Sequence, residues 1–143
     1  MTGALPSPAP SVVFVCVKNG GKSQLAAALM EMEAGGAVTV TSAGTEPGVA
    51  INPIAAEVLL DVGIDIRDEV PKLLTEELMR AASLVVVLGG DAKVRAIKGV
   101  GVEVWMIDEP SLRGIEGHRR MEMIRDEIHE KTKALKRRLL AEP

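Results

Sequence analysis

The chain has 143 residues and a formal net charge of −3, so it is long enough for one domain with a substantial core and lacks the bulk positive charge of a nucleic-acid-binding surface. Hydrophobic residues make up 47% of the sequence and charged residues 26%, as in an ordinary soluble protein, and no apolar run approaches the ~20 residues that cross a bilayer. The one cysteine, Cys16, excludes an internal disulfide and fits a reducing compartment. The first residues lack the basic and long apolar regions of a signal peptide, so we expect a cytoplasmic protein.

Residues 1–10 are rich in proline and alanine and are expected to form a flexible tail, whereas residues 11–143 are expected to form a single domain. Short apolar runs with β-branched residues predict strands at 11–15, 37–42, 84–88 and 102–107. Helical spacing and capping residues predict helices at 22–34, 53–62, 74–82, 91–97 and 115–139. This alternation is typical of an α/β fold, a parallel sheet with helices on both faces.

The first predicted strand ends at Cys16, which opens the sequence Cys-Val-Lys-Asn-Gly-Gly-Lys-Ser before a predicted helix. Gly20 and Gly21 allow the loop to curl, so that successive backbone N–H groups and the helix N-terminus can bind an anion. A cysteine at the first position would face that anion as a thiolate. The sequence therefore predicts a nucleophilic site for phosphate-like oxyanions.

The segment has two other interpretations, a structural cysteine and a nucleotide-binding loop. A lone cysteine at a strand end is often a small core residue with no chemical role. The ending Gly-Lys-Ser also resembles a nucleotide-binding loop, but the first glycine of that pattern would fall at position 16, where Cys16 stands. The glycine-bearing context favours the nucleophilic interpretation over both.

These motifs resemble the low-molecular-weight protein tyrosine phosphatase superfamily, which also contains the thiol-linked arsenate reductases. The family loop is Cys, five residues, Arg and Ser, and here Lys22 stands where arginine is usual. Residues 42–45, Ser-Ala-Gly-Thr, resemble the end of the family's second strand. Asp108 falls where the family carries its general acid, although Glu109 separates it from the proline that usually follows. The resemblance covers about residues 11–138 and implies a three-layer α/β/α fold with a four-stranded parallel sheet.

The resemblance implies a role for each residue of the site. Cys16 would be the nucleophile, Ser23 would hydrogen-bond its thiolate, and Lys22 would replace the two-pronged contact of arginine with a point charge. Asp108 would protonate the departing oxygen, with Glu109 as the competing candidate. The oxyanion would be held by the main-chain amides of Val17, Lys18, Asn19, Gly20, Gly21 and Lys22.

Several of these residues also have a simpler interpretation. Lys18 could be an exposed solubilising lysine, Ser23 a plain helix cap, and Asp108 a surface aspartate in a turn. The arginines that follow, Arg113, Arg119 and Arg120, are better explained as surface charge than as contacts to an anionic thiol. His118 and His129 are expected on a helix surface without partners suggesting a metal site.

The loop most resembles actinobacterial arsenate reductases with one essential cysteine, which depend on mycothiol and mycoredoxin. That resemblance implies a Cys16 thiol–arsenate adduct, resolved by an external thiol to give arsenite, with no tightly bound cofactor, nucleic acid or membrane as partner. A phosphatase acting on small phosphate esters or phosphoproteins is the first alternative, although a chain with no tyrosine and one phenylalanine offers little to enclose an aryl ring. A non-enzymatic oxyanion-binding module is the second.

Overall fold

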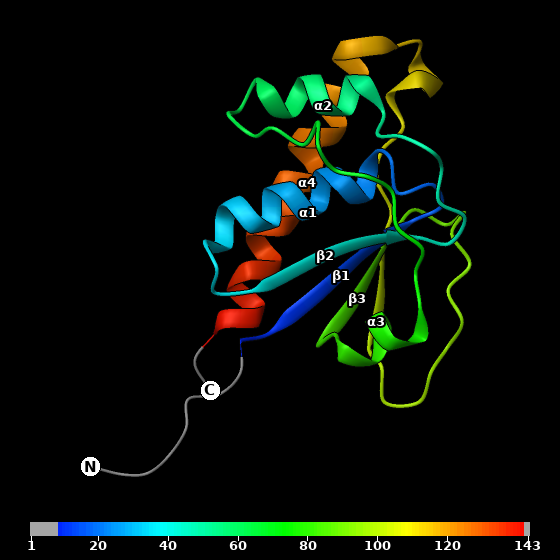
Figure 1. Cartoon of the computed structure of the whole chain (residues 1–143). Helices are drawn as coiled ribbons and strands as arrows, with labels where there is room; N and C mark the ends of the chain where they lie inside the picture. The colour runs from blue at the N-terminus through cyan, green and yellow to red at the C-terminus, as the bar shows by residue number, and fades with distance from the viewer. Residues whose placement is uncertain (1–8, 142–143) are drawn as a thin grey trace.

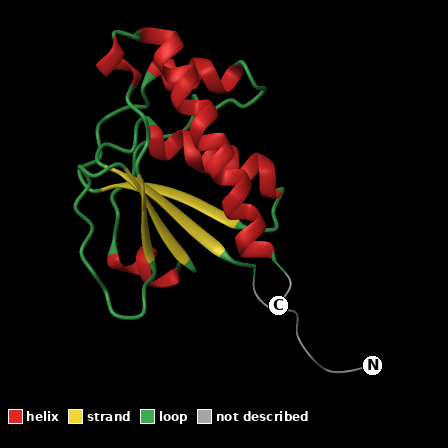
Figure 2. Ribbon diagram, turned by 180° about the vertical axis from the view of Figure 1, so that it is seen from behind, coloured by secondary structure: helices red, strands yellow, loops and turns green. Residues whose placement is uncertain are grey.

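The computed structural model describes residues 9–141, so residues 1–8 of the expected tail and the last two residues lie outside the described part. Four parallel strands form one sheet with the spatial order β2-β1-β3-β4 (Figures 1 and 2). The strands are β1 (Ser11–Cys16), β2 (Thr39–Gly44), β3 (Leu84–Leu88) and β4 (Val102–Trp105). The predicted α/β fold with a four-stranded parallel sheet is therefore confirmed.

Helices cover both faces of this sheet (Figure 2). One face is covered by α1 (Lys22–Ala34), α2 (Pro53–Leu60) and α4 (Gly117–Leu140). The other face carries the short helix α3 (Glu76–Ala81). A 3-10 turn, η1 (Pro110–Arg113), connects β4 to α4. The uneven cover leaves the larger core on the α1–α4 side.

The strands are apolar along their whole length because both of their faces are buried. Val12 and Phe14 point into the core beneath α1 and α4, whereas Val13 and Val15 pack on the α3 side. Phe14 also meets Trp105, with ring centroids 5.7 Å apart and planes tilted by 56°. The alternation continues to Cys16, which lies against the larger core and therefore faces the α1–α4 side of the sheet.

Helix starts follow the capping residues of the sequence. The Asn52 side chain accepts hydrogen bonds from the amides of Ile54 and Ala55 at 2.9 and 3.4 Å, and the Thr75 hydroxyl accepts one from Leu78 at 3.1 Å. Apart from the predicted helix at 91–97, every predicted element is present, and each begins and ends within two residues of its predicted bounds. No helix of residues 9–141 is long and apolar enough to span a membrane.

The predicted helix at 91–97 is wrong. Residues 89–101 connect β3 to β4 as an irregular segment, in which only Ala92 and Ile97 are fully buried. Glycines flank it on both sides, and Gly89 and Gly99 have φ values of 92° and 87° that continue neither a strand nor a helix. With few apolar contacts to offset the cost of ordering a short helix, the segment stays irregular.

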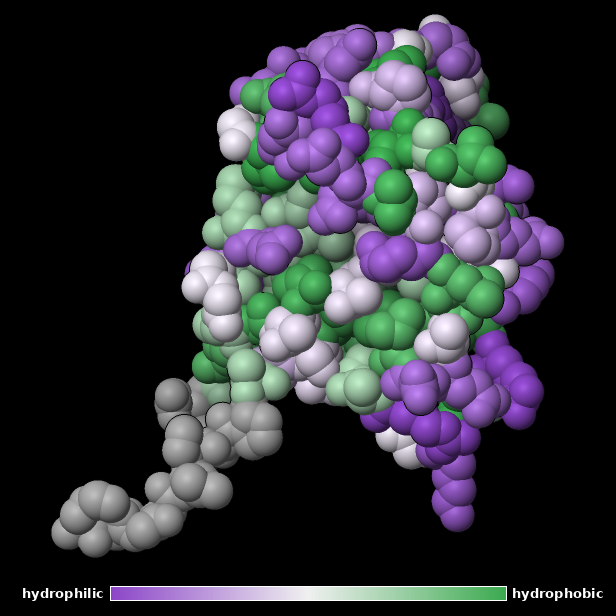
Figure 3. Space-filling model, in the orientation of Figure 1, coloured by the Kyte–Doolittle hydropathy of each residue, from purple (hydrophilic) through white to green (hydrophobic). Residues whose placement is uncertain are grey.

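The face seen in Figure 1 mixes apolar and polar side chains, as the space-filling view shows (Figure 3). Large apolar side chains that are well exposed somewhere on the molecule include Met32, Val49, Val70, Leu73, Met106 and Leu112. Scattered apolar residues of this kind are normal on soluble proteins.

Gly44, at the end of β2, approaches the loop after β1 so closely that a side chain would not fit. A Cβ at this position would lie 2.6 Å from the carbonyl oxygen of Val17 and 3.0 Å from the Cβ of Asn19. We expect Gly44→Ala to lower the free energy of unfolding by about 1–3 kcal/mol, as overpacking does, in urea titrations. Gly101→Ala is the matched control, because its Cβ would come no closer than 3.6 Å to a neighbouring atom, Cδ1 of Leu84. Equal losses in the two variants would contradict this explanation.

Candidate active site

Cys16 is the last residue of β1 and lies at the carboxyl edge of the sheet, where parallel α/β folds bind ligands. Its sulfur is 2.9 Å from the Ser23 hydroxyl and accepts a hydrogen bond from the amide of Asn19 at 3.2 Å. The side chain is only partly buried. The sulfur is thus held from the α1 side and still open to a reactant, which the interpretation as an inert core cysteine does not explain.

Asn19 organises the loop through all of its polar groups. Its side-chain amide donates to the Ser23 hydroxyl at 2.8 Å, and its side-chain oxygen accepts from the amide of Lys72 at 2.9 Å. Its main-chain oxygen accepts from the Gln24 side chain at 3.1 Å. Asn19 is fully buried and has φ of 55°, a left-handed conformation that asparagine tolerates better than most residues.

The carbonyl groups of the loop are bound by the segment that follows β2. The amides of Thr45, Glu46, Gly48 and Asn52 donate to the oxygens of Cys16, Val17, Lys18 and Gly20 at 2.8–3.1 Å. Residues 42–45 therefore support the loop through a hydrogen bond from Thr45, together with the close approach of Gly44 and the buried Ser42.

The amides of the loop, in contrast, are left for another acceptor. Within residues 9–141, no hydrogen bond uses the main-chain amides of Lys18, Gly20, Gly21 or Lys22 as donor. α1 begins at Lys22 with Gly21 as its cap and no side-chain capping bond. Unpaired donors at a helix N-terminus, beside the sulfur of Cys16, form an arrangement that can bind a tetrahedral oxyanion.

A cleft of about 260 Å³ opens over Cys16. Lys18 and Lys22 bring positive charge from the loop, Asp91 brings negative charge from the segment after β3, and Arg120 approaches from α4. A larger hollow of about 500 Å³ runs along β2, but it contains no thiol, so the cleft over Cys16 is the candidate site. The full lining is Cys16, Val17, Lys18, Gly21, Lys22, Asn52, Leu88, Gly89, Asp91, Arg120, Met121 and Ile124.

Two residues that line the cleft, Asp91 and Arg120, are not among the site residues predicted from the sequence. Asp91 follows β3 at the same edge of the sheet as Cys16, and that position after a buried strand was the signal available for it. The sequence favours a surface position for Arg120, but its side chain is only 26% exposed and lines the cleft.

The two candidate acids lie just beyond β4, and neither is among the residues that line the cleft. Asp108 is about half exposed and is gripped by both terminal nitrogens of Arg113, at 2.8 and 2.9 Å. The hydrogen bonds from Arg113 lower the pKa of Asp108. The amide of Asp108 also donates to the Glu127 carboxylate at 2.9 Å.

Glu109 has turned to a different partner. Its carboxylate accepts hydrogen bonds from Arg120, one of them from Nε at 2.7 Å, and from both the amide and the hydroxyl of Ser111. The bonds from Arg120, followed by those from Ser111, hold the pKa of Glu109 far below its ordinary value. Both carboxylates are therefore ionised at neutral pH in this arrangement, and a role as proton donor would require that an arginine first be displaced.

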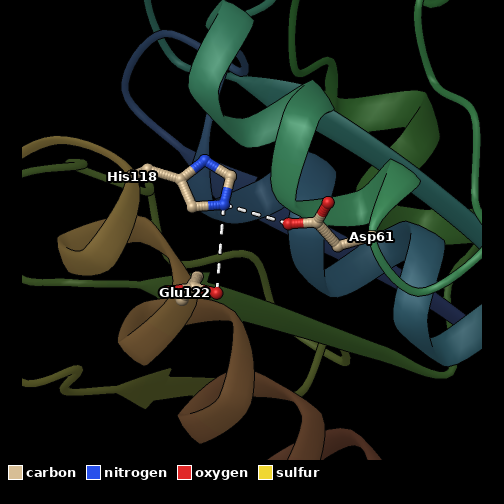
Figure 4. A group of neighbouring side chains, drawn as sticks. All are labelled: Asp61, His118 and Glu122. Carbon is tan, nitrogen blue, oxygen red and sulfur yellow. Dashed lines mark hydrogen bonds and ion pairs between the residues drawn. The ribbon is translucent and has the colours of Figure 1, made fainter.

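The expectation that His118 lacks carboxylate partners is wrong. Its ring nitrogens lie 3.0 Å from Asp61, 3.5 Å from Glu57 and 3.9 Å from Glu122, so it joins α4 to the end of α2 (Figure 4). Asp61, His118 and Glu122 are the one group of three or more His, Cys, Asp or Glu side chains in residues 9–141 that could converge on a metal ion. Its side chains are 30–49% exposed, and the imidazole already bonds to carboxylates, so we describe it as a link between the two helices.

The sequence profile of the family described as "Low molecular weight phosphotyrosine protein phosphatase" matches residues 11–142. The chain therefore belongs to this family. Among its relatives, arsenate reductase 1 of Staphylococcus epidermidis is 31% identical over 121 residues, which cover 82% of this chain and 89% of the relative. The arsenate reductase of Bacillus subtilis is 31% identical over 128 residues, or 85% and 91% of the two chains.

Solved structures agree with the fold. A thioredoxin-dependent arsenate reductase of Corynebacterium glutamicum is 32% identical with a TM-score of 0.76; the match covers 93% of this chain but 62% of that longer chain. An arsenate reductase in a phosphate-binding state has a TM-score of 0.77 at 23% identity, a level that supports the fold alone.

Removal of the Ser23 hydroxyl tests how the sulfur is held. A hydrogen bond to a charged group contributes about 1.5–3 kcal/mol, so we expect Ser23→Ala to slow alkylation of Cys16 by iodoacetamide roughly tenfold at pH 7. The rate is measured by mass spectrometry on the intact protein. Ser111→Ala is the control, because Ser111 bonds to Glu109 rather than to the sulfur. An unchanged rate in Ser23→Ala would show that Ser23 serves only the helix.

The His118 link predicts a pH-dependent stability. Desolvation lowers the pKa of His118, but the hydrogen bonds to Asp61 and Glu57 and the nearby carboxylate charges outweigh it, so the pKa is raised. A raised pKa stabilises the fold fully below the unfolded value of about 6.5, and this contribution disappears as pH rises through the folded value.

We therefore expect His118→Gln to lower the urea midpoint at pH 6 and to have little effect at pH 9. Arg80→Gln is the control, because Arg80 pairs with Glu76 on α3, on the other face of the sheet from His118. A His118→Gln effect that is equal at the two pH values would contradict the assignment.

Proposed function

We propose that the protein is an arsenate reductase that uses Cys16 as its nucleophile. One observation carries the proposal: a partly exposed sulfur, bound by Ser23 and Asn19, stands beside loop amides that have no acceptor in the described chain. Relatives named arsenate reductase, at 31% identity over more than four fifths of both chains, support arsenate as the oxyanion.

The reaction begins when the Cys16 thiolate attacks arsenic. A sulfur–arsenic bond forms, an arsenic–oxygen bond breaks, and the departing oxygen leaves as water after taking up protons; arsenic is still As(V). The amides of Lys18, Gly20, Gly21 and Lys22, together with the charge of Lys22, would stabilise the remaining oxygens. Asp108 is proposed as the proton donor for that step, after release from Arg113.

Two electrons must then come from outside, because the chain has a single cysteine. An external thiol attacks arsenic, forms a new sulfur–arsenic bond and frees Cys16. A second thiol attacks the sulfur of that thiol–arsenate, forms a disulfide and leaves the electron pair on arsenic as arsenite. Two thiols are thereby oxidised to one disulfide while As(V) becomes As(III).

We propose mycothiol as the first thiol and mycoredoxin as the second, in the cytoplasm and without a tightly bound cofactor. The single cysteine supports a donor of this kind, because an internal disulfide relay has no residues here. Thioredoxin is the competing reductant, since the relative from Corynebacterium glutamicum is named thioredoxin-dependent.

The second candidate function is a phosphatase, which the description of the family itself favours. The leaving oxygen of a phosphate ester carries no proton of its own, so its departure would depend fully on release of Asp108 from Arg113, which keeps that carboxylate ionised. Arsenate at neutral pH carries ionisable protons of its own. Phe14 and Trp105 are buried and pack on each other, so neither encloses an aryl ring. These features favour the reductase over the phosphatase. The non-enzymatic oxyanion-binding module is the least favoured of the three functions.

The test is arsenite production from arsenate by the purified protein, with mycothiol, mycoredoxin and their recycling enzymes, or with thioredoxin and its reductase. We expect turnover with the first system, and we expect Cys16→Ser to reduce it by several orders of magnitude, to background. Arg80→Gln, on α3, is the control for handling and folding.

The same samples are offered a small aryl phosphate. Phosphate release that depends on Cys16, without arsenite under either thiol system, would overturn the proposal in favour of the phosphatase. Turnover with thioredoxin alone would keep the reductase and refute mycothiol as donor.

A further inference from the structure

The anion-binding loop has an unusual cation at its end. Lys22 is the first residue of α1 and lines the cleft, but an ammonium group offers a point charge instead of the planar pair of donors with which a guanidinium binds an oxyanion. An arginine side chain does line the same cleft. It belongs to Arg120, which reaches it from α4.

Arg120 is held in a definite orientation. Glu109 grips one edge of the guanidinium, through Nε at 2.7 Å and through Nη2. Glu109 is fixed in turn by the amide of Ser111 at 3.1 Å and by its hydroxyl at 2.8 Å. A surface arginine that served only as solubilising charge would need none of these contacts.

The grip leaves the other edge of the guanidinium available. Arginine has five N–H donors, and the contact with Glu109 uses the single one on Nε and one of the two on Nη2. No hydrogen bond in residues 9–141 uses Nη1 of Arg120. The edge formed by Nη1 and the second hydrogen of Nη2 can therefore bind two oxygens of an anion while Glu109 keeps its place.

We propose that Arg120, positioned by Glu109, supplies the two-pronged oxyanion contact that Lys22 cannot make. The inference rests on the proposed function, because it concerns the oxyanion bound over Cys16. Arg120 is then a substrate-binding residue on α4, and Glu109 is a positioning residue that does not donate protons. The contact would take two equatorial oxygens on the side of the cleft opposite the loop amides.

The test is protection of Cys16 from iodoacetamide by arsenate or by inorganic phosphate, which needs no turnover and no thiol partner. For Arg120→Gln we expect the half-protecting concentration to rise about tenfold or more, the loss typical of charge-assisted hydrogen bonds. Arg120→Lys should lose nearly as much, since it keeps the charge without the fork. Arg119→Gln is the matched control, because Arg119 is the neighbouring arginine, pairs with Glu122 and has a side chain that is 67% exposed.

Two further variants separate a binding role from a structural one. Glu109→Gln keeps the Arg120 charge and should weaken protection by an intermediate factor. Lys22→Arg combined with Arg120→Gln should recover most of the lost protection, because it returns a guanidinium to the loop. A merely structural Arg120 would not be rescued in this way.

Protection of Arg120→Gln equal to that of the unsubstituted protein would overturn the inference, as would full protection in Arg120→Lys or the absence of rescue by Lys22→Arg. These outcomes leave the proposed function standing if the unsubstituted protein is protected and turns over arsenate. Absence of both protection and turnover in the unsubstituted protein would instead refute the proposed function.

Discussion

The hydrogen bonds of Asn19 hold the site together. This one buried side chain ties the loop after β1 to Ser23 on α1 and to the main chain at Lys72, while its own amide bonds to the sulfur of Cys16. Its left-handed backbone turns the loop so that carbonyl groups face the segment after β2, while the amides of Lys18, Gly20, Gly21 and Lys22 have no acceptor within residues 9–141. A buried amide with unmet partners is costly, so these bonds also fix the loop in one conformation.

The sheet, its helices and the nucleophile loop could be predicted from the sequence because their signals are local. Strands buried on both faces are apolar throughout, Asn52 and Thr75 mark helix starts, and Cys16 with the glycines after it defines the loop. The failures arose where distant contacts decide. Residues 91–97 have moderate helical spacing but too little to pack against. Two of the carboxylates around His118, Glu57 and Asp61, come from a part of the chain about 60 residues away.

The connection from β4 to α4 distributes charge in a way that residue types alone do not reveal. Two adjacent carboxylates each pair with a different arginine, Asp108 with the exposed Arg113 and Glu109 with the half-buried Arg120. Glu109, which separates Asp108 from Pro110, therefore has a different partner from Asp108. It binds an arginine of α4 that lines the cleft, and so joins the connection to the helix.

The two walls of the cleft differ in how firmly they are built. The loop of residues 17–21 has its carbonyls bound and its asparagine buried, whereas no amide of residues 90–99 donates to a backbone carbonyl within the described chain. Local opening requires breaking few bonds on that side and many on the other. Substitutions in the wall at Asp91 can therefore change which leaving groups or thiols fit the cleft while the loop of residues 17–21 stays unchanged. The specificity of this fold can then vary without loss of its anion-binding loop.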